Sequence, residues 1–181
     1  MDESEKPRYP LGDLNEPFGK VRAAVQAATY STGIYCPCCG GWAKRYKYTI
    51  NKSMAVGLMW LVQHYHPEQN RWVNVAHTAP RHVVQTNQLP TLRHWGLIIR
   101  PTEDPLWSFS GKTKHSGLWR PTETGIEFVR GRIQMPESVV TYKGEFEQFS
   151  GNKISIREAF DTNFDYQQAM LPVNGEIRRS T

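Results

Sequence analysis

Several features that would place a protein in a familiar class are missing from this sequence of 181 residues. No apolar run approaches the roughly 18 residues needed to cross a bilayer. The polar residues 1–10 contain acids and lack the apolar core of a secretory signal, so we expect a protein of the cytoplasm without a membrane partner. The three cysteines all lie within residues 36–39, which excludes a disulfide framework. The length excludes a large multidomain enzyme.

Familiar catalytic patterns are missing as well. The sequence contains no P-loop, no GxGxxG, no GxSxG and no HExxH. Glu68 is the only acid between residues 20 and 100, so a catalytic pair of carboxylates is excluded there. Carboxylates are found near the C-terminus instead, at Glu145, Glu147, Glu158, Asp161 and Asp165. Spaced carboxylates can hold Mg²⁺, but a solvated acidic surface is the simpler interpretation. We therefore predict that the protein is not an enzyme.

The scarcity of acids in the middle of the chain separates the charges. Residues 20–100 contain ten Lys and Arg residues and one acid, a net charge of +9 within a total of +5. The flanking residues 1–19 and 133–181 carry −3 and −2, and residues 101–132 carry +1. A basic stretch between acidic ends is a candidate surface for a polyanion. A solvated basic surface without such a partner is the alternative.

Hydrophobic periodicity predicts short helices and strands through the central residues. The strongest helical pattern covers 53–66, with Asn51 or Ser53 as its N-cap and Pro67 ending it. The other central elements expected are an extended segment at 71–77, helices at 79–86, 87–95 and 122–130, and strands at 97–100 and 118–121. We assign Trp95 and Trp119 to the core.

The ends of the chain carry weaker patterns. A short helix is expected at 20–31, and a hairpin is expected around Lys143-Gly144, with strands at 138–142 and 146–149. Helical turns are expected at 155–160 and 165–170.

Two runs of residues connect the central elements to a known architecture. The order of helix, strand, two helices, strand, loop, strand and helix is that of a winged helix-turn-helix. Within it, LRHWGLI at 92–98 and WRPTETG at 119–125 resemble bacterial winged-helix regulators of the MarR and PadR type, at the end of the recognition helix and just after the wing. The chain also resembles small phage and prophage proteins of unassigned function, in which a CPxCG knuckle precedes runs similar to RHWGLI and GLWRPTE.

The winged-helix resemblance implies a mode of binding to double-stranded DNA. A recognition helix would enter the major groove, which admits one α-helix. Its exposed side chains would be Thr86, Asn87, Gln88, Thr91, Arg93 and His94. Phosphate contacts would come from Arg81, Lys44 and Arg45, and from Lys112 and Lys114 on the wing at 108–117. The implied function is transcription regulation in a phage or mobile element, and a homodimer would fit it. The alternative is a winged-helix module that binds and inhibits a host or phage protein.

The cysteine cluster resembles one zinc knuckle. Residues 36–40 read CPCCG, in which Cys36 and Cys39 would offer two thiolates to one ion. A structural zinc site needs four ligands, and Cys38 and His66 are candidates for the other two. Alternative histidines are His64, His77 and His82. A knuckle that has lost its metal and a redox CxxC pair are the competing interpretations.

Together these patterns predict an α+β fold. It would consist of a winged helix-turn-helix core, an N-terminal segment like a zinc knuckle, and a small C-terminal unit of hairpin and helix. The expected segments are an arm and short helix at 1–32, the knuckle at 33–48, the winged helix-turn-helix at 49–132 and the C-terminal unit with its tail at 133–181.

Overall fold

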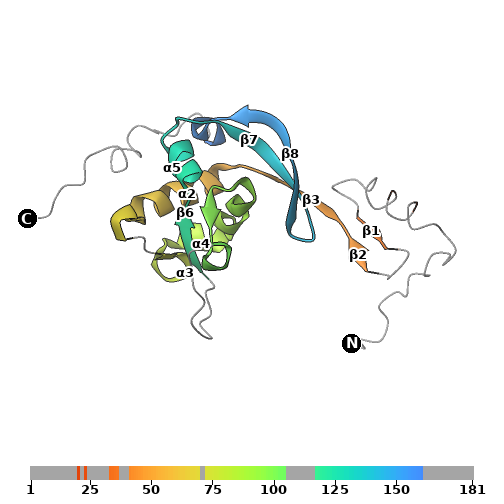
Figure 1. The fold of residues 1–181 in the computed structure, drawn as a ribbon, viewed down its shortest axis with the longest axis horizontal. Coiled ribbons are helices and arrows are strands. Elements are labelled where there is room, and N and C mark those ends of the chain that lie inside the picture. Colours follow the sequence, from red (N-terminus) through yellow and green to blue (C-terminus); the bar gives the residue numbers. More distant parts are fainter. Residues whose placement is uncertain are drawn as a thin grey trace, which may run out of the picture. The chain divides into compact units, whose positions relative to one another are not determined.

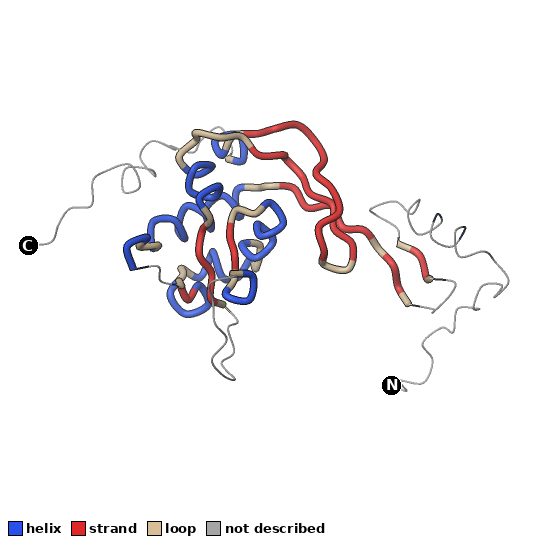
Figure 2. The backbone as a smooth tube through the Cα atoms, in the orientation of Figure 1, coloured by secondary structure: helices blue, strands red, loops and turns tan. Residues whose placement is uncertain are grey.

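A long hairpin near the C-terminus contributes to two structural units (Figure 1). The computed structural model describes Lys20, Ala23 and residues 33–36, 41–69, 72–104 and 117–160. The first unit, here named the strand unit, groups residues 1–48 with 139–149; the second, the helical unit, groups 49–138 with 150–181. The expected α+β class is confirmed, since both helices and strands are well represented (Figure 2). The four expected segments stay predictions.

The longest helix of the helical unit is α2, Lys52–His64. Asn51 is its N-cap, as expected, and the Asn51 side-chain oxygen accepts a hydrogen bond from the Met54 amide at 3.1 Å. The helix ends two residues earlier than expected, with Tyr65 as its C-cap, because Pro67 disfavours helical backbone at the residue before it. Leu58 and Leu61 are fully buried, one turn apart on the same face. Pro67–Gln69 follows as the 3-10 helix η1.

A three-stranded antiparallel sheet lies in the same unit. Its strands are β4 (Val73–Asn74), β5 (Ile98–Ile99) and β6 (Leu118–Pro121), in the order β4-β6-β5. Val73 pairs with Trp119, and Ile98 pairs with Pro121. The strand expected at 118–121 is confirmed, and so is the burial of Trp95 and Trp119.

The extended segment expected at 71–77 is wrong beyond Asn74. Helix α3, Val75–Thr78, begins there. The Val75 amide donates to the carbonyl of Gly117 at 2.8 Å, and the Thr78 hydroxyl donates back to the Asn74 carbonyl at 2.8 Å. Val73 and Val75 alternate as in a strand, but Val73 lies in β4 and Val75 is the first residue of α3.

The helix expected at 87–95 is present only from Leu89 to Trp95 and is a 3-10 helix. Helix α4 spans Arg81–Thr86, and Asn87 ends it in the left-handed conformation with φ of 47° instead of starting a new helix. The next element is the 3-10 helix η2, Leu89–Trp95. Its three buried residues, Leu89, Leu92 and Trp95, are three positions apart, and a 3-10 helix places such residues on one face because it has three residues per turn.

Helix α5, Glu123–Val129, packs closely against the start of β5. Thr122 is its N-cap, and the Thr122 hydroxyl oxygen accepts from the Gly125 amide at 3.0 Å. A Cβ at position 125 would collide with the Leu97 carbonyl oxygen, so only glycine permits this approach. Between β5 and β6 the structure also describes the 3-10 helix η3, Pro101–Glu103.

Strands dominate the other unit. Strands β1 (Ile34–Tyr35) and β2 (Trp42–Ala43) form a small antiparallel pair. Strands β3 (Arg45–Thr49), β7 (Met135–Tyr142) and β8 (Glu145–Ile154) form a sheet in the order β3-β7-β8. The expected hairpin is confirmed, with longer strands than predicted. Lys143 and Gly144 both have positive φ, 52° and 80°, as a tight two-residue hairpin turn requires.

The C-terminal helical turn expected at 155–160 is confirmed as the 3-10 helix η4, Ile156–Ala159. Lys20 and Ala23 have helical backbone, whereas the rest of the helix expected at 20–31 and the turn expected at 165–170 lie outside the described residues. Within the described ranges, no helix has the length and apolar character to cross a membrane.

Glu158 provides a test of the turn at η4. The Glu158 carboxylate accepts from the Ser155 amide at 2.6 Å and from the Ser155 hydroxyl at 2.7 Å, and these hydrogen bonds lower the pKa of Glu158 below its usual range. The lowered pKa stabilises the turn at neutral pH, and this contribution is lost as the pH falls through the pKa of the folded state. We expect Ser155→Ala to raise the pKa of Glu158, measured by NMR titration. An unchanged pKa would contradict the capping geometry.

Candidate nucleic-acid interface

Helix α4 presents the polar surface expected at the start of the interface. Arg81, Thr86 and Asn87 are exposed, while Val83 is buried and anchors the helix. When the Gln85 amide is turned so that its oxygen and its nitrogen both meet suitable partners, its oxygen accepts a hydrogen bond from Arg81 Nε at 2.8 Å. Arg81 and Gln85 lie one turn apart on the helix. The guanidinium of Arg81 thus has a neutral hydrogen-bond partner at the surface, in contrast to the arginines that face carboxylates.

The 3-10 helix η2 presents a second row of the expected residues. Gln88, Thr91 and His94 follow each other at intervals of three and are half-buried, one position before the buried row of Leu89, Leu92 and Trp95. The side-chain oxygen of Gln88 is buried without a hydrogen-bond partner in the described part of the chain. This row continues the polar surface of α4, although its half-burial leaves less side chain to project than an exposed α-helix would.

Arg93 is not presented as the sequence predicted. Its guanidinium lies 3.5 Å from the Glu103 carboxylate, which also binds Arg100 at 2.8 Å. Glu103 in turn caps the start of η3 by accepting from the Arg100 amide at 3.2 Å. One carboxylate thus faces two of the arginines of the basic stretch and would compete with a phosphate or a guanine for Arg93.

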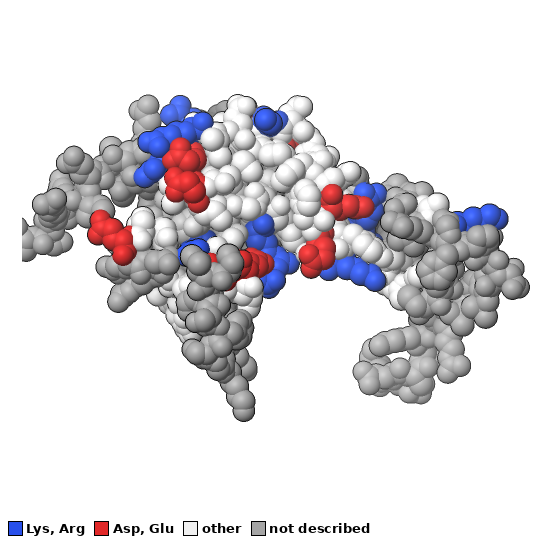
Figure 3. Space-filling view, viewed as in Figure 1, with Lys and Arg blue, Asp and Glu red and all other residues white. Residues whose placement is uncertain are grey.

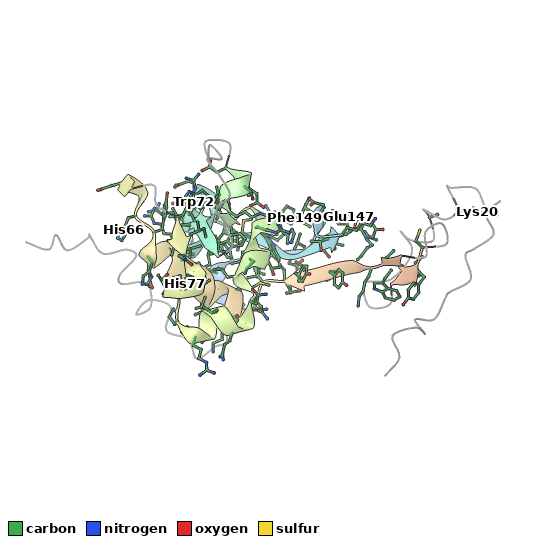
Figure 4. The ribbon with its side chains drawn as sticks, turned by 90° about the horizontal axis from the view of Figure 1, so that it is seen from below. Lys20, His66, Trp72, His77, Glu147 and Phe149 are labelled. Carbon is green, nitrogen blue, oxygen red and sulfur yellow. The ribbon has the colours of Figure 1, made fainter. Side chains whose placement is uncertain are left out.

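A second acid next to Glu103 is buried. Asp104 is 7% exposed, and its carboxylate lies 2.9 Å from the Arg120 guanidinium on β6. The other side of Arg120 is covered by the Trp72 ring, whose centroid is 4.9 Å away (Figure 4 labels Trp72). This brace joins the residue after η3 to β6 and to the residue before β4. Sequence reasoning missed it, although two adjacent acids directly after a basic stretch were a visible signal.

The basic stretch of the sequence is therefore interrupted by acids in space. Glu103 pairs with Arg93 and Arg100, and Asp104 pairs with Arg120. In the strand unit, Glu147 pairs with Arg45 at 2.7 Å. Figure 3 shows acidic side chains beside basic ones over the visible described surface, rather than one continuous basic area. The net charge of +9 for residues 20–100 therefore overstates the positive charge of the folded surface that these residues form.

The remaining expected phosphate contacts are divided between the units. Lys44 and Arg45 belong to the strand unit, and Arg45 is already paired with Glu147, so the structure does not group these two residues with α4. Lys44 lies over the Tyr46 ring, 5.3 Å from its centroid. Lys112 and Lys114, the wing residues, lie outside the described residues.

The cysteine cluster lies in the sequence between β1 and β2. The Cys36 amide donates to the Gly41 carbonyl at 2.8 Å, which joins the first residue of the CPCCG run to the residue that follows the run. Cys36 is half-buried and forms no disulfide, whereas Cys38 and Cys39 lie outside the described residues. No group of three or more possible ligands is present within the described ranges. His66, His64, His77 and His82 all belong to the helical unit (His66 and His77 are labelled in Figure 4). Zinc thus stays a prediction.

Metal content tests the knuckle directly. With Cys36 and Cys39 as ligands, we expect about one zinc per chain in protein purified without chelator, because a structural site is normally filled. Cys36→Ser should abolish zinc binding, measured by mass spectrometry of metals, while His66→Ala decides whether that histidine is a ligand. A content below about 0.2 zinc per chain in the unmodified protein would refute the prediction.

Comparison of the chain with family models, curated proteins and solved structures gives no match. Only the sequence and the geometry of the described residues therefore indicate a function.

The brace between Asp104 and Arg120 carries a prediction about stability. Asp104→Ala leaves a mostly buried guanidinium without its carboxylate, so we expect a loss of about 3 kcal/mol in the free energy of unfolding, measured by urea denaturation. The matched control is Glu103→Ala, which removes a neighbouring, more exposed carboxylate and should cost about 1 kcal/mol or less. Equal losses in the two variants would contradict the assignment of a structural role to Asp104.

Proposed function

We propose that the protein binds double-stranded DNA through a winged helix-turn-helix and acts as a transcription regulator of a phage or mobile element. In this proposal it works by binding and not by catalysis. The observation that carries it is the sheet order β4-β6-β5, with α3, α4 and η2 between the first two strands in sequence and η3 between β5 and β6. A winged helix has these connections: the strand after the wing lies in the centre of the sheet.

The two runs that resemble winged-helix regulators support the same proposal. LRHWGLI contains the end of η2 and the start of β5, and WRPTETG contains all of β6 except Leu118, together with the start of α5. Pairing of Ile98 with Pro121 brings the two runs together. This closeness supports the resemblance, which assigns the first run to the end of the recognition element and the second to the residues just after the wing.

Electrostatics favours α4 as the main phosphate contact. No acid occurs between Glu68 and Glu103 in the sequence, and α3, α4 and η2 all lie within this interval. Arg81 is exposed, and so are His77 and His82 on either side of it in the sequence. Since Glu103 faces Arg93, we assign phosphate binding chiefly to Arg81, and base contacts to Asn87, Gln88 and Thr91.

Binding to random duplex DNA tests the proposal. We expect binding at low salt, with an affinity that falls as salt rises because phosphate contacts release counterions. Arg81→Gln should weaken binding to all duplex sequences and reduce the slope of log affinity against log salt by about one, measured by fluorescence anisotropy. The matched control is Arg130→Gln, since Arg130 is an exposed arginine that pairs with Glu127 on α5.

Two outcomes would refute the proposal. The first is an absence of duplex binding at low salt, in which case the interaction with a host or phage protein becomes the leading hypothesis. The second is an equal loss in Arg81→Gln and Arg130→Gln, which would show that only overall charge matters. If binding is found, selection from a random DNA pool defines the sequence, and the length of the footprint reports whether one or two copies bind.

A further inference from the structure

The strand unit exposes most of the large apolar side chains of the described residues. The described residues include six large hydrophobic side chains that are exposed, and five of these belong to the strand unit. These five are Tyr35, Trp42, Tyr46, Phe146 and Phe149, and all are aromatic. Exposed aromatic rings gathered on one small unit indicate a binding surface more often than scattered aliphatic residues do.

Two side chains on β3 and that of the residue just before the strand form an ordered surface. Because side chains alternate along a strand, Lys44, Tyr46 and Tyr48 share one face. The rings of Tyr46 and Tyr48 are 6.3 Å apart between centroids and nearly parallel, at 14°, and Lys44 Nζ lies over Tyr46. We name these three residues the β3 ladder. Tyr46 is more exposed than Tyr48, with 43% of its surface accessible to solvent.

The opposite face of β3 carries polar side chains that are paired within the sheet. There Arg45 pairs with Glu147 at 2.7 Å, and the Thr49 and Ser138 hydroxyls are hydrogen-bonded at 2.8 Å. These polar groups satisfy one another within the sheet of β3, β7 and β8 (Glu147 is labelled on β8 in Figure 4). The ladder is thus the face of β3 that offers ring surfaces to an external partner, and β3 lies at an edge of its sheet.

The charge around the ladder selects the chemistry of that partner. The described part of the strand unit contains five Lys and Arg residues and two acids, Glu145 and Glu147. Positive charge beside parallel aromatic rings suits a polyanion that also has flat apolar groups. Single-stranded nucleic acid has both, because its bases are free to stack on aromatic side chains while its phosphates meet lysines. A duplex does not qualify, since its bases are already stacked on one another.

We propose that the β3 ladder binds single-stranded nucleic acid. A base stacks on the Tyr46 ring, and Lys44 contacts an adjacent phosphate. This surface belongs to the strand unit and does not depend on the duplex binding proposed for the helical unit. The protein would then hold two nucleic-acid sites of different kinds, one for duplex DNA and one for an unpaired strand.

The experiment measures binding of the full chain to fluorescein-labelled oligo-dT and oligo-U by anisotropy. Loss of the ring in Tyr46→Leu should weaken binding about tenfold, while Tyr46→Phe, which keeps the ring, should stay close to the unmodified protein. Lys44→Gln should reduce the slope of log affinity against log salt by about 0.7, the value for one contact to a single strand. Both tyrosine variants should keep the thermal midpoint of the unmodified protein, because position 46 is exposed.

The matched control is Phe149→Leu, which removes a ring of similar exposure, 46%, that packs on Phe146 instead of on the ladder. It should leave oligonucleotide binding unchanged. The proposal is overturned if the unmodified protein does not bind oligonucleotides at low salt, for instance because the rings bind a protein instead. It is also overturned if Phe149→Leu loses as much affinity as Tyr46→Leu, or if Tyr46→Phe does.

Parallel measurements with duplex DNA separate this proposal from the preceding one. Arg81→Gln should weaken duplex binding and leave oligonucleotide binding intact, and Tyr46→Leu should do the reverse. Loss of both kinds of binding in Arg81→Gln would mean one shared site and would overturn the β3 ladder as a separate surface. Oligonucleotide binding without duplex binding would support the ladder and refute only the winged-helix proposal.

Discussion

The close approach of Thr122 and Gly125 to the backbone of Gly96 and Leu97 is the constraint on which the helical unit depends. The Thr122 hydroxyl donates to the Gly96 carbonyl at 2.6 Å, and the Thr122 amide donates to the Leu97 carbonyl at 3.0 Å. The missing side chain at position 125 lets α5 lie directly on this junction. The end of η2, the start of β5 and the start of α5 are thus fixed together. The two runs that resemble winged-helix regulators meet here, so the resemblance reflects packing as much as function.

Local signals in the sequence were sufficient for several elements. The Asn51 cap, the strand at 118–121 and the capped turn after Ser155 were predictable because each depends on residues within one turn or one strand. The break at Asn87 was not, because its backbone could equally begin a helix or end one, and the buried spacing of three that favours a 3-10 helix is also compatible with an α-helix. The acid Asp104 was visible in the sequence, but its partner Arg120 was not, because the pairing of β5 with β6 that brings them together depends on residues far apart in the chain.

The candidate sites divided in the same way. The sequence identified the exposed polar positions on α4, since these follow from helical periodicity, but it treated charge as a property of segments. In the folded chain Glu103 lies next to Arg93 and Glu147 lies next to Arg45. In each pair the arginine comes from the basic residues 20–100 and the acid comes from a later part of the sequence. The tyrosines of β3 had drawn no attention because alternation on a short strand is common, and only the parallel rings and the paired opposite face distinguish them.

The spacing of three in η2 has a consequence for how the chain can vary in length. Leu89, Leu92 and Trp95 are buried together, and the Trp95 indole also donates to the Pro136 carbonyl at 2.7 Å. Inserting or deleting one residue within η2 would rotate everything beyond it by about 120°, which turns part of the buried row toward solvent. Homologous chains should therefore keep this segment constant in length even where its polar residues change, and gain or lose residues elsewhere.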